Sequence, residues 1–359
     1  MAKFAGYEMP MWYEGIIPET MSVRGRAGIF DVSYMGRIFF TGEDAPRFLD
    51  HVATAEISML QPLQAKYCML CNESGSIIDD MIVVKLEEKK YLAVWNASNR
   101  EKNMNWVQKN AANYSIAIDD ISDRSFMIAL QGPMSQGFLQ GHCDVDLGIL
   151  KRNRGAWGNV EGVNCLITRT GYTGEDGFEL ISLELQGAEK AWSSLIASGA
   201  TPSGLGARDV LRMEAGFALY GNEIDETTNP LEVRLEFALK LDRAEFIGKE
   251  ALLKVQARGL NRYLMGIRMV SRGIPREGSE LIMENKKIGY VTSGTFSPTL
   301  KTGIAIGYVY SALPCGTEIT VDIRGNACRG IITEMPFYDQ GKYGRTRTST
   351  DAAYLKPTG

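Results

Sequence analysis

Two adjacent carboxylates, Asp79 and Asp80, stand inside the apolar run GSIIDDMIVVKL, residues 75–86. Neighbouring residues of a β-strand point to opposite faces of the sheet, so the two side chains diverge. Both faces are otherwise apolar, and at least one carboxylate therefore points into an apolar wall. An ionised carboxylate in such a place is costly unless another group pairs with it. This pair is therefore the first candidate for a functional site.

The overall composition is that of an ordinary globular protein. The chain has 359 residues and a mass of 39.7 kDa, with 45% hydrophobic and 23% charged residues, which is enough for two or three domains. The formal net charge of -4 and the lack of a Lys/Arg-rich run argue against a broad nucleic-acid surface. No apolar stretch approaches a membrane span, and the N-terminus lacks a signal-peptide core. We expect a soluble, cytoplasmic protein.

Histidine and cysteine chemistry is poorly represented in this chain. Only His51 and His142 occur, and neither lies in a motif. The patterns HExxH, GxGxxG, GxSxG and Walker A are absent. Cys68 and Cys71 form one CxxC without a second pair at zinc-ribbon spacing, and we expect both to be reduced core residues. If the chain is an enzyme, carboxylates, tyrosines and arginines must carry the chemistry.

The region after the carboxylate pair predicts a hairpin followed by a helix. The strand that holds the pair and the segment YLAVWN, residues 91–96, flank a short EEKK turn. Ser98 and Glu101 then have the spacing of a capping box, and apolar residues follow at helical intervals. Asn96 thus lies where a strand ends and a helix begins. It could face a ligand cleft, although a turn-forming asparagine is the commoner explanation.

A glycine-rich loop, RTGYTGEDGFEL at residues 169–180, interrupts two strand-like runs. Its three glycines permit backbone turns and the close approach of a ligand. Glu179 stands between two apolar residues of the strand that follows. A buried carboxylate there could accept two parallel donors, such as the edge of an aminopyrimidine. The alternative is a hairpin turn with solvated acids, which composition alone favours.

The segment LGARDVLRMEAGFAL, residues 205–219, looks like a helix with two arginines on one face. Arg208 and Arg212 are four residues apart and therefore lie one turn from each other. They could anchor the carboxylates of a ligand, or they could pair with aspartate and glutamate side chains. Taken alone, the second use is the more common.

The chain changes character near residues 255–262. Before this point, helical and strand-like segments are mixed, which indicates an α+β fold. Beyond it come five short strand-like runs separated by Gly, Pro and Asn turns, which are typical of a small barrel or sandwich. We expect an α+β body over residues 1–255 and an all-β C-terminal domain over residues 262–345.

Six motifs occur in order along nearly the whole chain: GIFDVSYMGR, SGSIIDDMIVV, RTGYTGEDGFEL, LGARDVLRMEAG with LYGNEID, EFIGKEAL and TSGTFSPTL. Together they resemble the aminomethyltransferase of the glycine cleavage system, the T protein, and its tetrahydrofolate-dependent relatives. The resemblance implies a three-domain cloverleaf around a central channel that holds tetrahydrofolate. In that arrangement the body consists of two interleaved subdomains, and the C-terminal domain is a β-barrel.

The resemblance also implies a reaction and its partners. The aminomethyl group would move from a dihydrolipoyl arm on a carrier protein, the H protein of the glycine cleavage system, to tetrahydrofolate. Ammonia would be released, and 5,10-methylenetetrahydrofolate would remain. Tetrahydrofolate is then a co-substrate, and no metal is required. Neither nucleic acid nor a membrane is an expected partner.

Residue roles carried over from the resemblance centre on the carboxylates. Asp79 would lie beside the folate nitrogens that receive the one-carbon unit and would be the catalytic acid. We expect Asp79 to face the cavity and Asp80 to be paired elsewhere, with an arginine or backbone donors. Glu179 would hold the donor edge of the pterin, and Arg208 would lie at the folate end of the site.

Four further residues are expected to bind folate. Tyr67 and Asn96 match positions that line the folate cavity in the family. Tyr172, in the glycine-rich loop, would form a wall of the same pocket. Tyr343 is the corresponding match near the C-terminus.

Some positions depart from the family pattern and leave alternatives open. Tyr34 replaces the histidine of the common DVSHMG, Thr20 replaces that of the usual EEH, and PLEVRLEFALKLD replaces a more usual sequence. A relative that takes one-carbon units from a small methylated compound is therefore the nearest alternative. A folate-binding iron–sulfur assembly factor is a more distant one, because the cysteine of its KGCYxGQE motif is missing from the glycine-rich loop.

Overall fold

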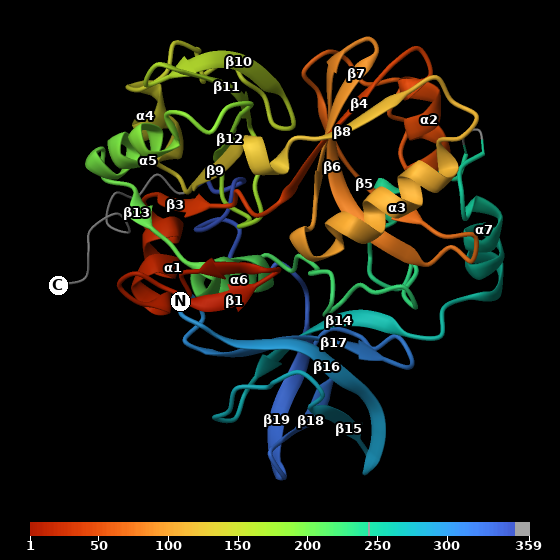
Figure 1. Cartoon of the computed structure of the whole chain (residues 1–359). Helices are drawn as coiled ribbons and strands as arrows, with labels where there is room; N and C mark the ends of the chain where they lie inside the picture. The colour runs from red at the N-terminus through yellow and green to blue at the C-terminus, as the bar shows by residue number, and fades with distance from the viewer. Residues whose placement is uncertain (243–244, 349–359) are drawn as a thin grey trace.

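The computed structural model describes residues 1–242 and 245–348, which form three lobes around a common centre (Figure 1). Two lobes combine a β-sheet with helices, and the third is a closed β-barrel. The expected α+β cloverleaf with a C-terminal barrel is therefore confirmed. A small N-terminal hairpin, β1 (Ala2–Phe4) and β2 (Tyr7–Met9), precedes the lobes.

The first lobe is built on a five-stranded antiparallel sheet. Its strands are β4 (Gly36–Thr41), β5 (Ala65–Cys71), β6 (Ile77–Glu87), β7 (Lys90–Trp95) and β8 (Ala117–Asp120). They pair in the order β5-β6-β7-β4-β8. Helices α2 (Ala45–Val52) and α3 (Arg100–Asn110) lie on one face (Figure 1). Trp95, Phe48 and Val107 belong to the core under these helices, and burying such side chains is the main stabilisation of a lobe of this size.

The predicted helix after the hairpin is present, but its predicted capping box is wrong. A 3-10 turn, η1 (Ala97–Asn99), comes first, and α3 begins only at Arg100. Asn99 is the residue before the helix, and no side-chain cap forms there. The turn places Ser98 before the helix start, so Ser98 and Glu101 no longer have the relation of a capping pair.

The second lobe is a six-stranded sheet that the N-terminal part of the chain helps to form. Its strands are β3 (Gly28–Asp31), β9 (Phe126–Gln131), β10 (Gly155–Val160), β11 (Val163–Thr168), β12 (Gly177–Ser182) and β13 (Thr201–Pro202), in the order β10-β11-β12-β9-β3-β13. All neighbours are antiparallel except β13 and β3. The first lobe is thus inserted in the chain between β3 and β9.

The helices of the second lobe fall into two groups. Helices α4 (Ser135–Gln140) and α5 (Ala188–Ala197) lie on the outer side of its sheet, while α1 (Ile16–Gly25) and α6 (Leu205–Glu214) lie together between the lobe and the barrel (Figure 1). Short 3-10 turns, η2 (Ser122–Arg124) and η3 (Glu236–Ala238), occur in the connections.

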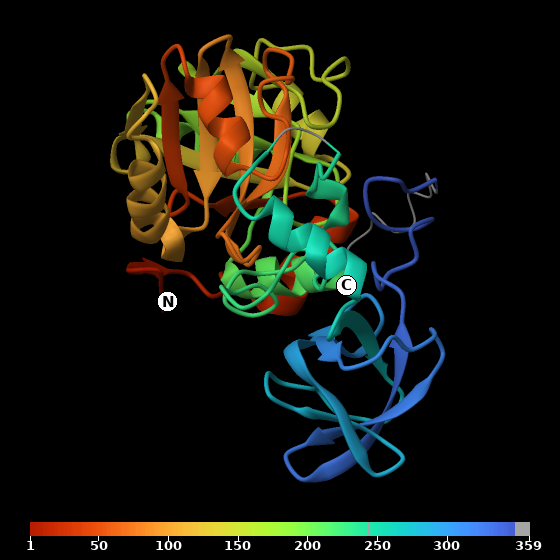
Figure 2. The ribbon, with the colours of Figure 1, turned by 90° about the vertical axis from the view of Figure 1, so that its right-hand side faces the viewer.

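The third lobe is a closed six-stranded barrel, which settles the choice between barrel and sandwich. Its strands are β14 (Tyr263–Met269), β15 (Glu280–Met283), β16 (Lys286–Ser297), β17 (Thr302–Val309), β18 (Glu318–Ile323) and β19 (Asn326–Thr333). Five of them match the five predicted runs, and the four-residue β15 was not predicted. Helix α7 (Lys249–Arg258) packs beside the first lobe and leads into the barrel (Figure 2). We retain a boundary at residues 255–262, at the end of α7, as a proposal.

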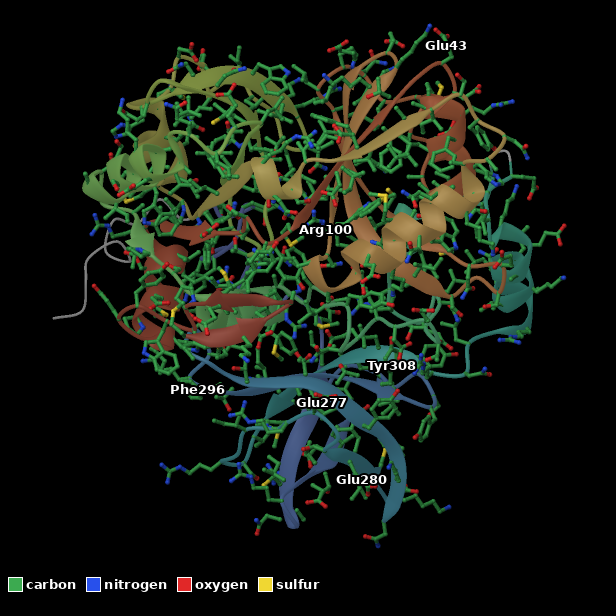
Figure 3. All side chains as sticks on the ribbon, viewed as in Figure 1. Glu43, Arg100, Glu277, Glu280, Phe296 and Tyr308 are labelled. Carbon is green, nitrogen blue, oxygen red and sulfur yellow. The ribbon has the colours of Figure 1, made fainter. Side chains whose placement is uncertain are left out.

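A buried ion-pair network joins the barrel to the body. Arg212 of α6 donates to Glu223 Oε2 at 2.7 Å and to Ser293 Oγ of β16 at 2.8 Å. The hydroxyl of Tyr308 on β17 donates to the carbonyl of Glu223 at 2.7 Å, and Tyr308 lies at the end of the barrel that meets the body (Figure 3). Arg212 also pairs with Asp209 at 2.8 Å. The ion-pair alternative for Arg212 is therefore correct.

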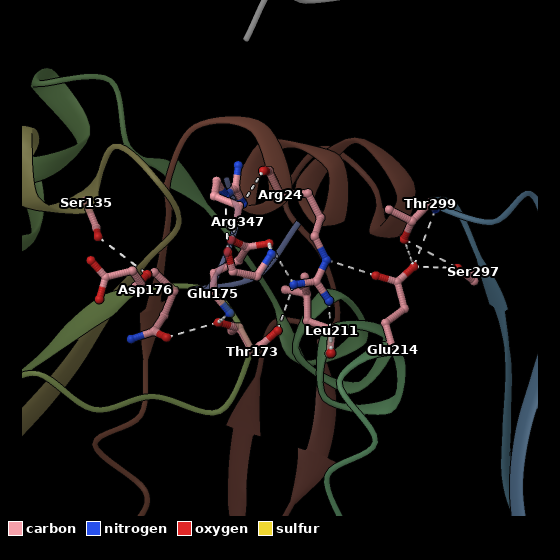
Figure 4. Close-up of polar contacts among 12 residues, drawn as sticks. Arg24, Ser135, Thr173, Glu175, Asp176, Leu211, Glu214, Ser297, Thr299 and Arg347 are labelled. Carbon is pink, nitrogen blue, oxygen red and sulfur yellow. Dashed lines mark hydrogen bonds and ion pairs between the residues drawn. The ribbon is translucent and has the colours of Figure 1, made fainter. Parts of the chain in front are cut away.

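A second buried network, the Arg24 cluster (Arg24, Glu175 and Glu214), joins α1 to the glycine-rich loop and to α6 (Figure 4). Arg24 donates to Glu175 Oε1 at 3.0 Å and to Glu214 Oε2 at 3.0 Å, and all three side chains are fully buried. Glu214 also accepts from Ser297 Oγ of β16 at 2.5 Å, and Arg347 pairs with Glu175. The cluster therefore connects the second lobe, the barrel and the C-terminal segment.

Replacing Arg24 with leucine should destabilise the whole protein. The change leaves two buried carboxylates without their shared cation, and a broken buried pair typically costs about 3–5 kcal/mol. Urea unfolding followed by fluorescence measures the loss. The matched control is Arg47→Leu, because Arg47 is 67% exposed beside Asp44 and such pairs contribute about 0–1 kcal/mol. Equal midpoints for the two variants would contradict the assigned role of the Arg24 cluster.

Candidate active site

A cavity of about 770 Å³ lies where the lobes meet. The first lobe contributes residues of β5 and β6, and the second lobe contributes the glycine-rich loop and Glu179 of β12. Residues from segments 215–222 and 233–237 and Leu264 of the barrel also line it. Pockets of this size hold drug-sized ligands. All three lobes therefore take part in one site.

Strand β6 separates the two aspartates. Met81 and Val83 pack in the core under α2 and α3, while Ile82 and Val84 pack in the core on the other face of the sheet. Asp79 shares the first face and is fully buried, whereas Asp80 lines the cavity. The expectation that Asp79 faces the cavity is therefore wrong. Strand alternation puts Asp79 under α3, so Asp80 is the acid that a ligand can reach.

Asp79 is held by asparagine amides in place of an arginine. Its Oδ1 accepts from Asn96 Nδ2 at 2.8 Å and from Asn99 Nδ2 at 2.6 Å, and its Oδ2 accepts from Asn103 Nδ2 at 2.5 Å. Burial, and after it the charge of Asp80, raise the pKa of Asp79 to about 7, although the three amide donors oppose the rise.

Asp80 also accepts hydrogen bonds from neutral donors. The hydroxyl of Tyr67 donates to its Oδ2 at 3.0 Å, and Asn96 Nδ2 donates to its Oδ1 at 2.8 Å. Burial raises the pKa of Asp80, and these two donors oppose the rise. Tyr67 and Asn96 both line the cavity, as predicted. Asn96 therefore contributes more than a turn, since its side chain contacts both aspartates.

A second buried carboxylate, Glu179, lies in another part of the cavity lining. Glu179 is 8% exposed, and its Oε2 accepts a hydrogen bond from Thr170 Oγ1. Burial raises the pKa of Glu179, while the Thr170 donor and the positive charge of Arg208 oppose the rise. A buried carboxylate at a cavity wall can accept donors from a ligand, so the solvated-hairpin alternative does not describe Glu179.

Arg208 and Tyr172 form a stacked wall of the cavity. The Arg208 guanidinium lies 4.9 Å from the centroid of the Tyr172 ring, and this ring lies 5.7 Å from that of Phe217. The Tyr172 hydroxyl donates to the carbonyl of Ala218 at 2.5 Å, which fixes the plane of the ring. Tyr172 and Arg208 both line the cavity, as predicted.

Tyr343 is the folate-binding candidate that the structure leaves outside the cavity lining. It lies edge-on to Tyr338, with ring centroids 6.5 Å apart. Arg345 lines the cavity instead, because its backbone N–H donates to the carbonyl of Gly174 at 3.0 Å and places it beside the glycine-rich loop. Sequence reasoning also missed Arg152. An isolated exposed arginine gives no sequence signal, so neither could have been found that way.

The remaining polar candidates lie away from the cavity lining. Cys68 and Cys71 are buried and reduced, as expected. His142 contacts Glu161 at 2.6 Å and Ser198 in the second lobe. No group of three or more possible metal-ligating side chains occurs within residues 1–242 and 245–348. Over the same residues, no helix is long and apolar enough to span a bilayer.

The raised pKa of Asp79 should make the protein's stability depend on pH. The pKa of about 7 in the folded protein exceeds the value of about 3.9 for an unfolded chain. The unfolded chain therefore binds fewer protons between these values, and the contribution of Asp79 to stability is lost as pH rises through 7. Asp79→Asn should raise the melting temperature, relative to wild type, more at pH 8 than at pH 5.

Calorimetry of both proteins at the two pH values checks this expectation. Glu43→Gln is the control, because Glu43 is an exposed carboxylate paired with Lys89 on the surface (Figure 3). The difference in melting temperature between Glu43→Gln and wild type should be the same at both pH values. A constant difference for Asp79→Asn as well would contradict the assignment of a buried titrating carboxyl group at this position.

A large cavity between three lobes, lined by aromatic rings and buried acids, is suited to an extended, polar aromatic ligand. Comparison with known proteins identifies the class of protein. Residues 1–243 match the model of the GCVT N-terminal domain, and residues 262–339 match that of the glycine cleavage T-protein C-terminal barrel domain.

Individual relatives agree with these family models. The chain is 44% identical over 344 residues to an aminomethyltransferase of Caldanaerobacter subterraneus subsp. tengcongensis, covering 93% of this chain and 91% of the relative. It is 41% identical over 338 residues to that of Thermosipho melanesiensis, covering 94% and 93%. Its fold matches the crystal structure of glycine cleavage system aminomethyltransferase T from Bartonella henselae with a TM-score of 0.89 and 32% identity, over 96% of this chain and 95% of the other. The chain belongs to the glycine cleavage T-protein family of aminomethyltransferases.

Proposed function

We propose that this protein transfers the aminomethyl carbon of an S-aminomethyldihydrolipoyl carrier protein to tetrahydrofolate. The products are 5,10-methylenetetrahydrofolate, ammonia and the dihydrolipoyl carrier. The observation that carries the proposal is the placement of one carboxylate, Asp80, at the wall of a ligand-sized cavity in a member of this family. The H protein as the carrier and a cytoplasmic location remain predictions.

The cavity is suited to tetrahydrofolate in size and in chemistry. Glu179 presents a carboxylate that can accept two parallel N–H donors from an aminopyrimidine edge. The Tyr67 and Phe237 rings, 5.8 Å apart, and the Tyr172 ring offer aromatic surface, against which a pterin or benzoyl ring can stack. Asp79 does not contact the cavity. We therefore assign to Asp80 the folate contacts that were expected of Asp79.

The carboxylates of the folate glutamate can meet two arginines. Arg152 and Arg345 both line the cavity. Burial, and then the positive charge of Arg152, lower the pKa of Arg345, so the two guanidiniums repel each other. An anionic ligand group between them would relieve this repulsion.

Asp80 has a role in both halves of the transfer. The carbon–nitrogen bond to ammonia breaks as the folate N5 attacks the aminomethyl carbon, and the carbon–sulfur bond breaks as the N10 bond forms. The two N–H protons of tetrahydrofolate end on ammonia and on the thiol, and Asp80 can accept and return them one at a time. Its negative charge also stabilises the iminium-like positive charge that develops on this carbon as each leaving group departs.

Asp80→Asn should abolish most of the turnover. The amide keeps the shape of the side chain but neither accepts a proton nor carries charge, so formation of 5,10-methylenetetrahydrofolate from the loaded carrier should fall about 100-fold or more. The product is measured by absorbance coupled to a dehydrogenase. Asp225→Asn is the control, because Asp225 accepts hydrogen bonds from Thr227 and is outside the cavity lining.

The same assay separates the alternatives. Full turnover of Asp80→Asn would remove the proposed role of this residue. If wild-type protein binds tetrahydrofolate but forms no product from the loaded carrier, the aminomethyl assignment fails, and small methylated compounds become the donors to test.

Glu179→Gln should weaken tetrahydrofolate binding with a smaller effect on turnover at saturation. The substitution removes the negative charge and replaces one of the two acceptor oxygens with an NH2 group, which cannot accept a hydrogen bond from an N–H group of the ligand. We therefore expect Kd to rise about 10- to 100-fold. Isothermal titration calorimetry with tetrahydrofolate under anaerobic conditions gives the value. An unchanged Kd would show that Glu179 does not contact the pterin.

A further inference from the structure

An exposed phenylalanine forms part of the cavity lining. Phe237, in the 3-10 turn η3, is 70% exposed and lines the cavity. Other large hydrophobic side chains of the described residues are also open to solvent, but none of those belongs to this lining. Single apolar side chains on a protein surface are ordinary. The position of Phe237, which is shared between solvent and the cavity, marks an opening of the site.

A single aromatic ring separates Phe237 from Asp80. The Phe237 ring stacks on that of Tyr67, with centroids 5.8 Å apart and planes inclined by 23°. The Tyr67 hydroxyl donates to Asp80 Oδ2 at 3.0 Å. A molecule that enters along the exposed side of Phe237 therefore reaches Asp80 after passing one tyrosine.

The turn that carries Phe237 is fixed to the first lobe. Thr54 Oγ1 donates to the carbonyl of Ala238 at 3.0 Å, and the backbone N–H of Lys240 donates to the carbonyl of Thr54 at 3.0 Å. The turn also packs against β5, which holds Tyr67. The opening is therefore a preformed surface. It lies in the segment PLEVRLEFALKLD, whose sequence departs from the family pattern.

An exposed cation stands beside the ring. Arg234 lines the cavity and forms no ion pair with any residue that the structure describes. It stands between the buried residues Val233 and Leu235 and has a left-handed φ of 61°, which residues other than glycine seldom adopt. Glu236, the acid of the same turn, is exposed and outside the lining. The opening thus combines an apolar ring with a guanidinium that can meet an acidic partner.

The two substrates of the proposed reaction place different demands on the cavity. In the assignment above, tetrahydrofolate extends from Glu179 toward Arg152 and Arg345, which all line the cavity. The dihydrolipoyl arm is a chain of methylene groups tethered to a protein. Its tether must pass through an opening to solvent, and its apolar stem gains free energy from an apolar surface at that opening.

We propose that Phe237 receives the aliphatic stem of the dihydrolipoyl arm at the cavity opening, and that Arg234 binds an acidic side chain of the carrier beside it. The proposal rests on the function proposed above and deepens it, because it assigns the place of the partner on this chain. The body of the carrier stays outside, next to Arg234, while the arm carries the aminomethyl carbon inward to Asp80. An arginine at the rim mainly sets orientation and the rate of association.

The test compares two forms of the carrier by isothermal titration calorimetry under anaerobic conditions. One is the dihydrolipoyl H protein, and the other is the H protein with its lysine unmodified. Phe237→Ala should raise the Kd of the dihydrolipoyl form about tenfold, because the stem loses its apolar contact, and leave the Kd of the unmodified form unchanged. The Kd of tetrahydrofolate should change little, because Tyr67 and Tyr172 remain. In turnover, KM for the loaded carrier should rise while kcat stays close to that of wild type.

Matched variants show whether the apolar surface itself is responsible. Phe237→Leu keeps apolar surface at the opening and should recover most of the affinity. Met59→Ala is the control, because Met59 is also 70% exposed but lies outside the lining. This variant should bind both forms of the carrier as wild type does.

Arg234→Gln tests the contact with the body of the carrier. The Kd of both carrier forms should rise about three- to tenfold, and the difference from wild type should shrink when salt is raised from about 0.05 M to about 0.5 M. Arg47→Gln is the control, because Arg47 is an exposed arginine of α2 outside the lining.

The outcomes separate this proposal from the proposed function. If wild type transfers the aminomethyl group but Phe237→Ala leaves the Kd of the dihydrolipoyl carrier unchanged, the entry at Phe237 is overturned and the function stands. If the Kd of tetrahydrofolate rises as much as that of the carrier, the ring is a wall for folate and the entry is again overturned. Selective weakening of the dihydrolipoyl carrier, in a protein that does not transfer the group, supports the entry and overturns the function. A wild-type protein that binds neither carrier form overturns both.

Discussion

The buried guanidinium of Arg24 is the interaction on which the arrangement of the lobes depends. It lies between Glu175 of the glycine-rich loop and Glu214 of α6, and Glu214 is in turn bonded to Ser297 of the barrel. Because buried charges are tolerated only when their partners are in place, the cluster accepts one relative placement of these elements. That placement brings the glycine-rich loop and α6 to the edge of the cavity, so the site exists only when the lobes are assembled.

Strand β6 places two neighbouring acidic residues in different environments. One face carries Asp79 into the core under α3, and the other presents Asp80 to the cavity. The asparagines that satisfy Asp79 come from the segment between β7 and α3 and from α3 itself, and one of them also reaches Asp80. The packing of the first lobe and the chemistry of the cavity thus share the same hydrogen bonds. This explains how a costly buried acid fits a stable sheet.

Sequence patterns predicted the parts of this protein that have strong local signals. The barrel strands, the hairpin and the family motifs were readable because alternation, turns and ordered motifs are local properties. The sequence did not show which of Asp79 and Asp80 faces the cavity. Strand alternation predicts that their side chains diverge, but it does not predict which face of the sheet a helix covers. For the same reason Arg345 could not be found and Tyr343 was misplaced: the path of the C-terminal segment is set by contacts with Gly174, far away in the chain. The short strand β15 had too few residues for a pattern.

The opposite facing of the two acids on β6 also limits how the chain can vary in length. The pairing of β6 with β5 already has a register shift between Ile77 and Asp79. A further insertion or deletion of one residue that neither the turn nor a bulge absorbs would turn every following side chain of β6 to the other face. The asparagines would then meet one acid and the cavity the other, while the hydrophobic pattern would reverse as well. Loop length can vary outside this hairpin. Within it, natural variants and engineered libraries should keep the same number of residues. The register of β6 next to Asp79 therefore determines which carboxyl group a substrate encounters.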